Sequence, residues 1–118
     1  MREVLVVDDD PCQLRIRGAI LRSAGLTVHS AANAEGALAS LRSVGDQIGV
    51  VVTDHLLPGR TGADLVRELR LTLPLLPVVV LSGMPGIDGE YEGLNVSIRL
   101  KPFPPEELIR VVQGSLAQ

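Results

Sequence analysis

The hydrophobic positions of this chain form five short apolar runs, at residues 4–7, 26–30, 49–53, 77–81 and 96–100. The second run alternates apolar with polar residues, which is typical of an edge strand, whereas the first, third and fourth runs are nearly continuous. Continuous runs of this length are typical of strands buried on both faces of a parallel sheet. The third run contains three consecutive valines and is expected at the centre of the sheet.

Stretches with helical periodicity lie between these runs, and a glycine or a proline follows each of the first three stretches. Residues 84–95 are rich in glycine and acidic residues without a 3.6-residue period, so any helix there should be short or irregular. Alternating strands and helices predict an α/β fold of three layers, a (βα)5 doubly wound parallel five-stranded sheet. The helix starts are marked by Asp10-Pro11, Asn33, the capping-box pair Thr61 and Asp64, and Pro104-Pro105.

The length of 118 residues fits a single domain over residues 1–118, with enough apolar residues for one core. A net charge of −3 without a run of basic residues argues against a nucleic-acid surface. The longest apolar stretch is short and interrupted by prolines, so no membrane span is expected. The single cysteine, Cys12, cannot form an internal disulfide, which suits a reducing compartment. We therefore expect a cytoplasmic domain that binds neither nucleic acid nor a membrane.

Reactive side chains follow or end four of the five predicted strands. Because the ligand site of an open parallel sheet lies outside the carboxyl ends of its strands, these side chains should meet at one edge. The alternative is a set of unrelated, solvated strand ends, which the joint spacing makes improbable. The side chains are those of Asp8, Asp9, Asp54, Ser82 and Lys101.

This set of groups favours phosphoryl chemistry. Neighbouring carboxylates repel one another, and a hard divalent cation such as Mg²⁺ removes the conflict while keeping positions open for phosphoryl oxygens. Lys101 adds a compact positive charge for the same oxygens, and Ser82 adds a hydroxyl donor. A carboxylate can itself attack phosphorus to give an aspartyl phosphate, with metal and lysine stabilising the equatorial oxygens.

The segments VLVVDDDP, VVTDHLLPGRTG, VVVLSG and LKPF, in this order, resemble the receiver domain of two-component response regulators over essentially the whole chain. The resemblance implies the flavodoxin-like strand order 2-1-3-4-5. It implies a signalling domain rather than an enzyme, phosphorylated on Asp54 by a histidine kinase or a histidine phosphotransfer domain. Ser82 and Lys101 would contact the phosphoryl group, and the Lys101-Pro102 bond would be cis. The implied Mg²⁺ ligands are Asp8, Asp9, Asp54 and the backbone carbonyl of Leu56.

The chain departs from the usual receiver pattern in two places. Ile98 stands where many receivers have an aromatic switch residue, and the segment between Ser82 and Lys101 is short and rich in glycine. By resemblance, the short loop between Ser82-Gly83 and Lys101-Pro102-Phe103 favours the C-terminal receiver of a hybrid sensor histidine kinase over a free-standing or N-terminal receiver. The output surface should therefore differ from the usual one, and weak homodimerisation is also compatible with the resemblance. Apolar Leu56 and Met84 beside the acceptor predict slow self-hydrolysis of the phosphoryl group.

Several interpretations stay open at this point. Asp10 is interpreted as a helix cap rather than a metal ligand, and His55 as an exposed loop residue. A receiver-like module that docks a partner without phosphorylation is the alternative to a phosphorylation switch. A Mg²⁺-dependent phosphatase of the aspartyl-phosphate type is a weaker alternative, because Leu56 occupies the position of its second acid.

Overall fold

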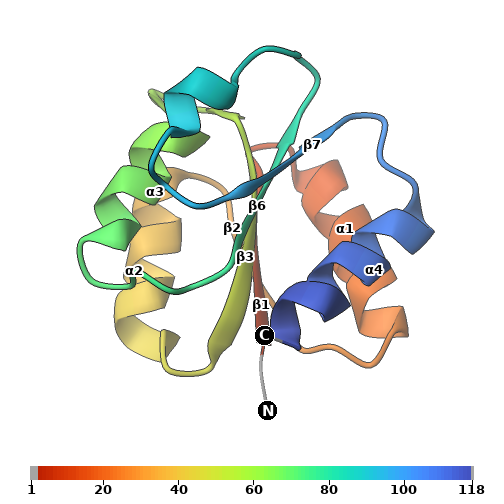
Figure 1. Ribbon diagram of the computed structural model, residues 1–118. Helices are drawn as coiled ribbons and strands as arrows, with labels where there is room; N and C mark the ends of the chain where they lie inside the picture. The colour runs from red at the N-terminus through yellow and green to blue at the C-terminus, as the bar shows by residue number, and fades with distance from the viewer. Residues whose placement is uncertain (1–2, 118) are drawn as a thin grey trace.

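The computed structural model describes residues 3–117 and has three layers, with a parallel sheet between two pairs of helices. Figure 1 views the sheet nearly edge-on, with α2 and α3 on one face and α1 and α4 on the other. The sheet strands are β1 (Glu3–Val7), β2 (Val28–Ala31), β3 (Ile48–Asp54), β6 (Val78–Ser82) and β7 (Ser97–Leu100). The helices are α1 (Pro11–Ser23), α2 (Ala34–Val44), α3 (Gly62–Arg70) and α4 (Pro105–Leu116).

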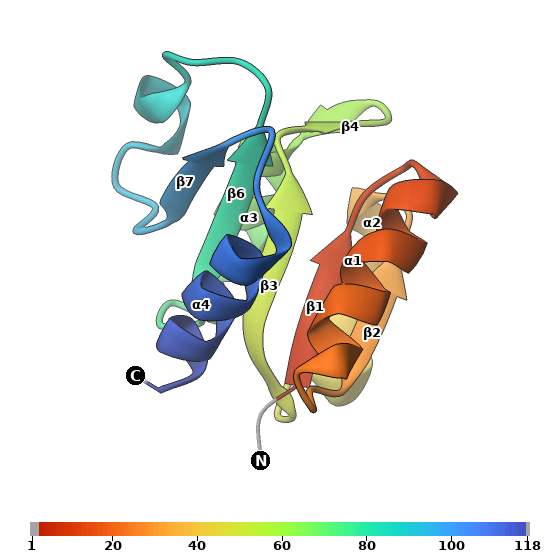
Figure 2. The same ribbon diagram turned by 90° about the vertical axis from the view of Figure 1, so that its right-hand side faces the viewer.

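The strand order in the sheet is β2-β1-β3-β6-β7, and every neighbouring pair is parallel. The two short strands β4 (Leu56–Leu57) and β5 (Arg60–Thr61) form a separate antiparallel hairpin. The order expected from the receiver resemblance, 2-1-3-4-5 for the five sheet strands, is thus confirmed. Figure 2 shows β3 between β1 and β6, and all seven residues of β3 are buried, as the valine run predicts.

The alignment of neighbouring strands fixes which residues leave the sheet side by side. Val7 pairs with Thr53 between β1 and β3, and Asp54 pairs with Leu81 between β3 and β6. The residue after β1 and the last residue of β3 therefore emerge next to each other at the carboxyl edge. Valine, leucine and alanine fill the core on both faces of the sheet, with Tyr91 the one buried aromatic residue of the described chain.

The first three predicted helix starts are confirmed by capping hydrogen bonds, and the fourth by the start of α4 at Pro105. The Asp10 carboxylate accepts from the Cys12 N–H at 2.9 Å, and the Asn33 side chain accepts from the Gly36 N–H at 2.7 Å. Thr61 and Asp64 form both hydrogen bonds of a capping box at the start of α3. Asp10 is therefore a helix cap, as interpreted from the sequence.

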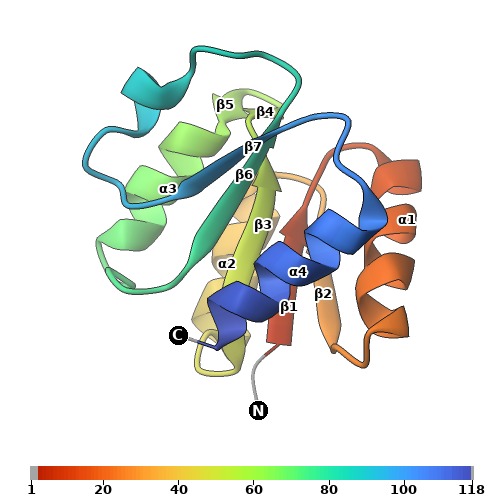
Figure 3. The same cartoon turned by 45° about the vertical axis from the view of Figure 1, so that its right-hand side comes forward.

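The crossover between β6 and β7 contains a single 3₁₀ turn, η1 (Asp88–Tyr91), in place of an α-helix. Figure 3 shows this turn above α3. The glycine-rich, aperiodic sequence of residues 84–95 predicts this outcome. In the part of the chain that the structure describes, no helix has the length and apolar character needed to cross a membrane.

Candidate functional site

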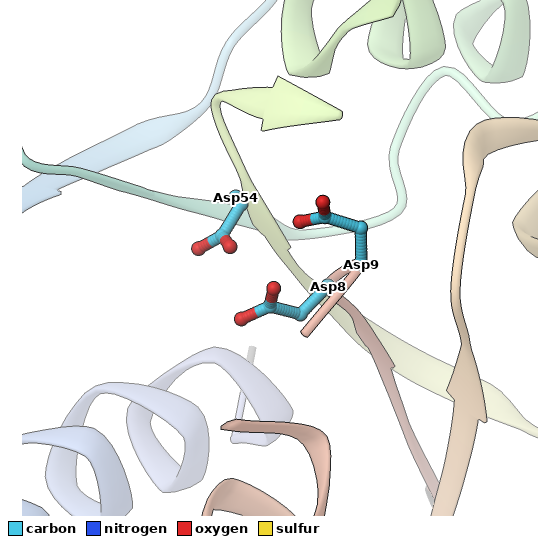
Figure 4. A group of neighbouring side chains, drawn as sticks. All are labelled: Asp8, Asp9 and Asp54. Carbon is cyan, nitrogen blue, oxygen red and sulfur yellow. The ribbon is translucent and has the colours of Figure 1, made fainter. Parts of the chain in front are cut away.

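Three carboxyl groups meet at the carboxyl edge of the sheet. Asp8 and Asp9 follow β1, Asp54 ends β3, and one carboxylate oxygen from each lies within 4.8 Å of the others. Figure 4 shows the three carboxyl groups turned toward one common space. Asp8 and Asp54 are 1% and 6% exposed, whereas Asp9 is open to solvent. The strand-end convergence predicted from the sequence is present.

Lys101 reaches the same site from the end of β7. Its Nζ lies 2.9 Å from Oδ1 of Asp54, and its backbone N–H donates to the Ser82 carbonyl at 2.8 Å. The Lys101-Pro102 peptide bond is cis, as the resemblance implies. The lysine therefore neutralises one carboxylate of the group while its ammonium remains partly exposed to a ligand.

A second cation, Arg17 of α1, contacts these carboxyl groups and was not predicted from the sequence. Its Nη1 lies 2.5 Å from Oδ2 of Asp8 and 3.3 Å from Oδ1 of Asp54, and its side chain is about nine-tenths buried. The sequence holds a usable signal for it. Arg17 falls three residues after Leu14 and four before Leu21, on the apolar stripe that α1 turns toward the sheet.

The site has an excess of negative charge, with three carboxylates against two cations. Burial raises the pKa of Asp8, and the hydrogen bond and negative charge that it shares with Asp54 raise it further. The Asp10 N–H, which donates to Asp8 Oδ1 at 3.0 Å, and the Arg17 charge act in the opposite direction. Carboxylate oxygens are the ligands that Mg²⁺ takes in proteins, so the donor set fits a hard divalent cation.

Ser82 and the β3–β4 connection border a cavity of about 340 Å³ beside Asp54 and Lys101. The Ser82 hydroxyl donates to the Met84 carbonyl and accepts from the Met84 N–H, both at 2.9 Å, so in this structure it faces its own loop. Leu56, 60% exposed, and Met84, 43% exposed, line the same cavity with apolar side chains. Of the predicted site residues, Asp54, Leu56, Ser82 and Lys101 line this cavity, whereas Asp8 and Asp9 do not. A Cβ at neighbouring Gly83 would meet nothing within 4 Å.

His55 is buried, and the interpretation of it as an exposed loop residue is wrong. It is 3% exposed, its Nδ1 lies 2.8 Å from the Tyr91 hydroxyl, and its Nε2 lies 3.6 Å from a Glu90 carboxylate oxygen. The 3₁₀ turn η1 thus packs over the residue that follows Asp54. Burial, and after it the Glu90 charge, raise the pKa of Tyr91, so its phenol stays protonated as a hydrogen-bond partner.

Residues 4–113 match the family model of the response regulator receiver domain. The chain belongs to this family. Among solved structures, this receiver is similar to the chemotaxis response regulator CheY4 of Vibrio cholerae, with a TM-score of 0.88, 27% identity and 98% of both chains covered. It is also similar to a response regulator receiver protein from Pseudomonas putida, with a TM-score of 0.88, 29% identity, and 97% of this chain and 98% of that one covered.

Curated relatives of this receiver include both regulators and a kinase. It is 38% identical over 118 residues to the sensor kinase CckA of Brucella abortus, covering 96% of this chain and 12% of the kinase. It is 35% identical over 112 residues to the transcriptional regulatory protein AruR of Pseudomonas aeruginosa, covering 90% of this chain and 46% of AruR. The chain spans about half or less of the length of the curated relatives it matches.

Proposed function

We propose that this receiver domain accepts a phosphoryl group on Asp54 from the phosphohistidine of a histidine kinase or of a histidine phosphotransfer domain. The observation that carries the proposal is the position of the Asp54 carboxylate. It ends the central strand, lies 2.9 Å from the Lys101 ammonium, and has two further carboxylates within 4.8 Å. Membership of the receiver family supports the same assignment.

In the proposed transfer, a carboxylate oxygen of Asp54 attacks the phosphorus atom. The O–P bond forms as the P–N bond breaks, and the electron pair of that bond stays on the leaving imidazole nitrogen. Lys101 stabilises negative charge on the phosphoryl oxygens. Ser82 reaches the phosphorylated Asp54 when its hydroxyl leaves the Met84 backbone for a phosphoryl oxygen. The receiver thus acts as an acceptor in a relay rather than as an enzyme with its own substrate.

Mg²⁺ is the proposed cofactor, held by Asp8, Asp9, Asp54 and the Leu56 backbone carbonyl. When bound, it supplies positive charge to the phosphoryl oxygens and relieves the repulsion among the carboxylates. Asp9 is exposed to solvent, unlike Asp8 and Asp54, and Leu56 begins β4 two residues after Asp54. The exposed apolar side chains of Leu56 and Met84 leave attacking water without a polar guide, so slow self-hydrolysis stays a prediction.

The pathway around the receiver also stays a prediction. Its relatives include a sensor kinase and transcriptional regulators, so the origin as the C-terminal receiver of a hybrid histidine kinase competes with a free-standing or N-terminal receiver. Four further statements also stay predictions. They are a cytoplasmic location, the absence of nucleic-acid and membrane partners, a single domain over residues 1–118, and weak homodimerisation.

Intact-mass measurement after incubation with acetyl phosphate and Mg²⁺ tests the proposal. We expect one added phosphoryl group on the unmodified protein and none on Asp54→Asn. Asp46→Asn is the matched control, because exposed Asp46 lies in the turn before β3, at the opposite end of this strand. No adduct on the unmodified protein, or an adduct that survives Asp54→Asn, would defeat the proposal. Partner binding that is unchanged by Asp54→Asn would favour docking without phosphorylation.

A further inference from the structure

The Arg17 guanidinium contacts two of the carboxylates that the proposed function assigns to Mg²⁺. Nη1 alone bridges them, at 2.5 Å from Asp8 Oδ2 and 3.3 Å from Asp54 Oδ1. The Asp54 Oδ1 atom also accepts from Lys101 Nζ at 2.9 Å, so it already has two cationic neighbours. A metal ion that took both carboxylates would meet a positive charge at the same oxygen atoms.

The position of Arg17 in α1 shows that the contact is part of the packing. The residue occupies the apolar stripe between Leu14 and Leu21, where a charged side chain costs solvation free energy unless it is paired. Its two partners in the described structure are the buried carboxylates of Asp8 and Asp54. Without Arg17, Asp54 would keep Lys101 as a close side-chain cation, whereas Asp8 would have no ion-pair partner among the described residues. The arginine and the acids therefore stabilise each other.

The structure also leaves space for the guanidinium to move away. Arg17 lines a cavity of about 420 Å³ between α1 and the segment that leads into α4, together with Gln13, Ile20, Lys101 and Phe103. Arginine has a long, flexible side chain, so the guanidinium can move from the carboxylates into this cavity without unfolding α1.

We propose that Arg17 is an internal counter-ion of the metal site, which neutralises Asp8 and Asp54 in the metal-free protein and competes with Mg²⁺ for them. The inference rests on the proposed function, because it concerns the same carboxylates. Arg17 weakens Mg²⁺ binding and so sets the Mg²⁺ concentration at which Asp54 can accept a phosphoryl group. It is a positioning residue, since it acts on the acceptor through the carboxylates and the metal.

Isothermal titration with MgCl₂ on the unmodified protein, Arg17→Met and Arg15→Met tests this proposal. Arg17→Met should bind Mg²⁺ about tenfold more tightly, because the ion no longer displaces a cation from Asp8 and Asp54. Arg15→Met removes the same charge from an exposed position of the same helix and should leave the affinity unchanged. Equal affinities for the two variants would overturn the proposal, as would the absence of Mg²⁺ binding to all three proteins.

A second measurement avoids dependence on the fold of Arg17→Met. In the unmodified protein, NMR signals of the Arg17 guanidinium should shift as MgCl₂ is added, while those of exposed Arg15 stay in place. An unchanged Arg17 signal at saturating Mg²⁺ would overturn the proposal. Treating the same samples with acetyl phosphate separates the two ideas. Tighter Mg²⁺ binding by Arg17→Met without any phosphoryl adduct would uphold the role of Arg17 and defeat the proposed phosphorylation of Asp54.

Discussion

The Gly62→Ala substitution probes how closely α3 is fitted against the segment that carries Asp54. Gly62 is the first residue of α3, and its N–H donates to the His55 carbonyl at 2.6 Å. A Cβ atom placed on it would lie 2.6 Å from the Tyr91 hydroxyl and 2.7 Å from the backbone oxygen of Asp54. Ordinary contacts of carbon atoms lie at about 3.5–4.0 Å, so the start of α3 would have to move away from β3.

Two effects of opposite sign set the size of the change. Overpacking of this kind costs about 1–3 kcal/mol, whereas alanine gains about 0.5–1 kcal/mol over glycine by restricting the unfolded chain. The contact with the Asp54 carbonyl cannot be relieved by a side-chain rotation, so the first effect should dominate. We expect the free energy of unfolding to fall by about 1–2 kcal/mol, and Tm by about 4 °C for each kcal/mol in a domain of this size.

Urea unfolding followed by circular dichroism measures this difference. Gly114→Ala is the matched control, because Gly114 is exposed in α4 and a Cβ there would meet nothing within 4 Å. That variant should be more stable by about 0.5–1 kcal/mol. Adding Tyr91→Phe removes one of the two closest contacts, so the double variant should lose less than the sum of the single changes. A Gly62→Ala protein as stable as Gly114→Ala would refute the reasoning.

Three further changes concern α3. Thr61→Ala removes the cap of the helix and should lower the free energy of unfolding by about 1 kcal/mol in urea, and no loss would contradict the capping box. The Thr61 N–H holds the pKa of Asp64 below its usual value, so ionised Asp64 supports the fold at neutral pH. This support disappears as the pH falls through the lowered pKa of Asp64. The difference in Tm between the unmodified protein and Asp64→Asn should therefore shrink on acidification, and a difference that stays constant would contradict this role of Asp64. Leu65→Ala, in the core, should lower the free energy of unfolding by about 2–5 kcal/mol. Leu71→Ala, at a site 82% exposed, should change it by no more than about 0.5 kcal/mol. Similar losses in the two variants would contradict the observed packing.

The elements of the sheet edge could be predicted because each one depends on local signals. The apolar run before Asp54 sets the central strand, and the spacing of Thr61 and Asp64 sets the start of α3. The convergence of Asp8, Asp54 and Lys101 follows from a general property of parallel sheets. The strand order could not be predicted from local signals, and it was inferred from the resemblance to receiver domains.

The features of the site that were not predicted from the sequence depend on contacts between segments far apart in the chain. His55 is buried because Tyr91, 36 residues later, packs its hydroxyl against the imidazole ring, and no pattern around residue 55 reveals this contact. Arg17 is different, since a basic residue on the apolar stripe of α1 is visible in the sequence and indicates a buried acidic partner. Periodicity shows which face of a helix is covered, but the identity of the covering group needs the fold.

The pairing of Val7 with Thr53 makes Asp54, the proposed phosphoacceptor, a reporter of strand alignment. Side chains alternate between the two faces of a strand. A slip of one residue between β1 and β3 would therefore turn the Asp54 side chain away from Asp8. A molecule with misaligned strands could thus keep its size and much of its secondary structure and still fail to accept a phosphoryl group. If Asp54 is phosphorylated as proposed, the fraction of molecules that accept a phosphoryl group would measure the fraction with the native alignment of β1 and β3. A measurement of molecular size would not distinguish the two alignments.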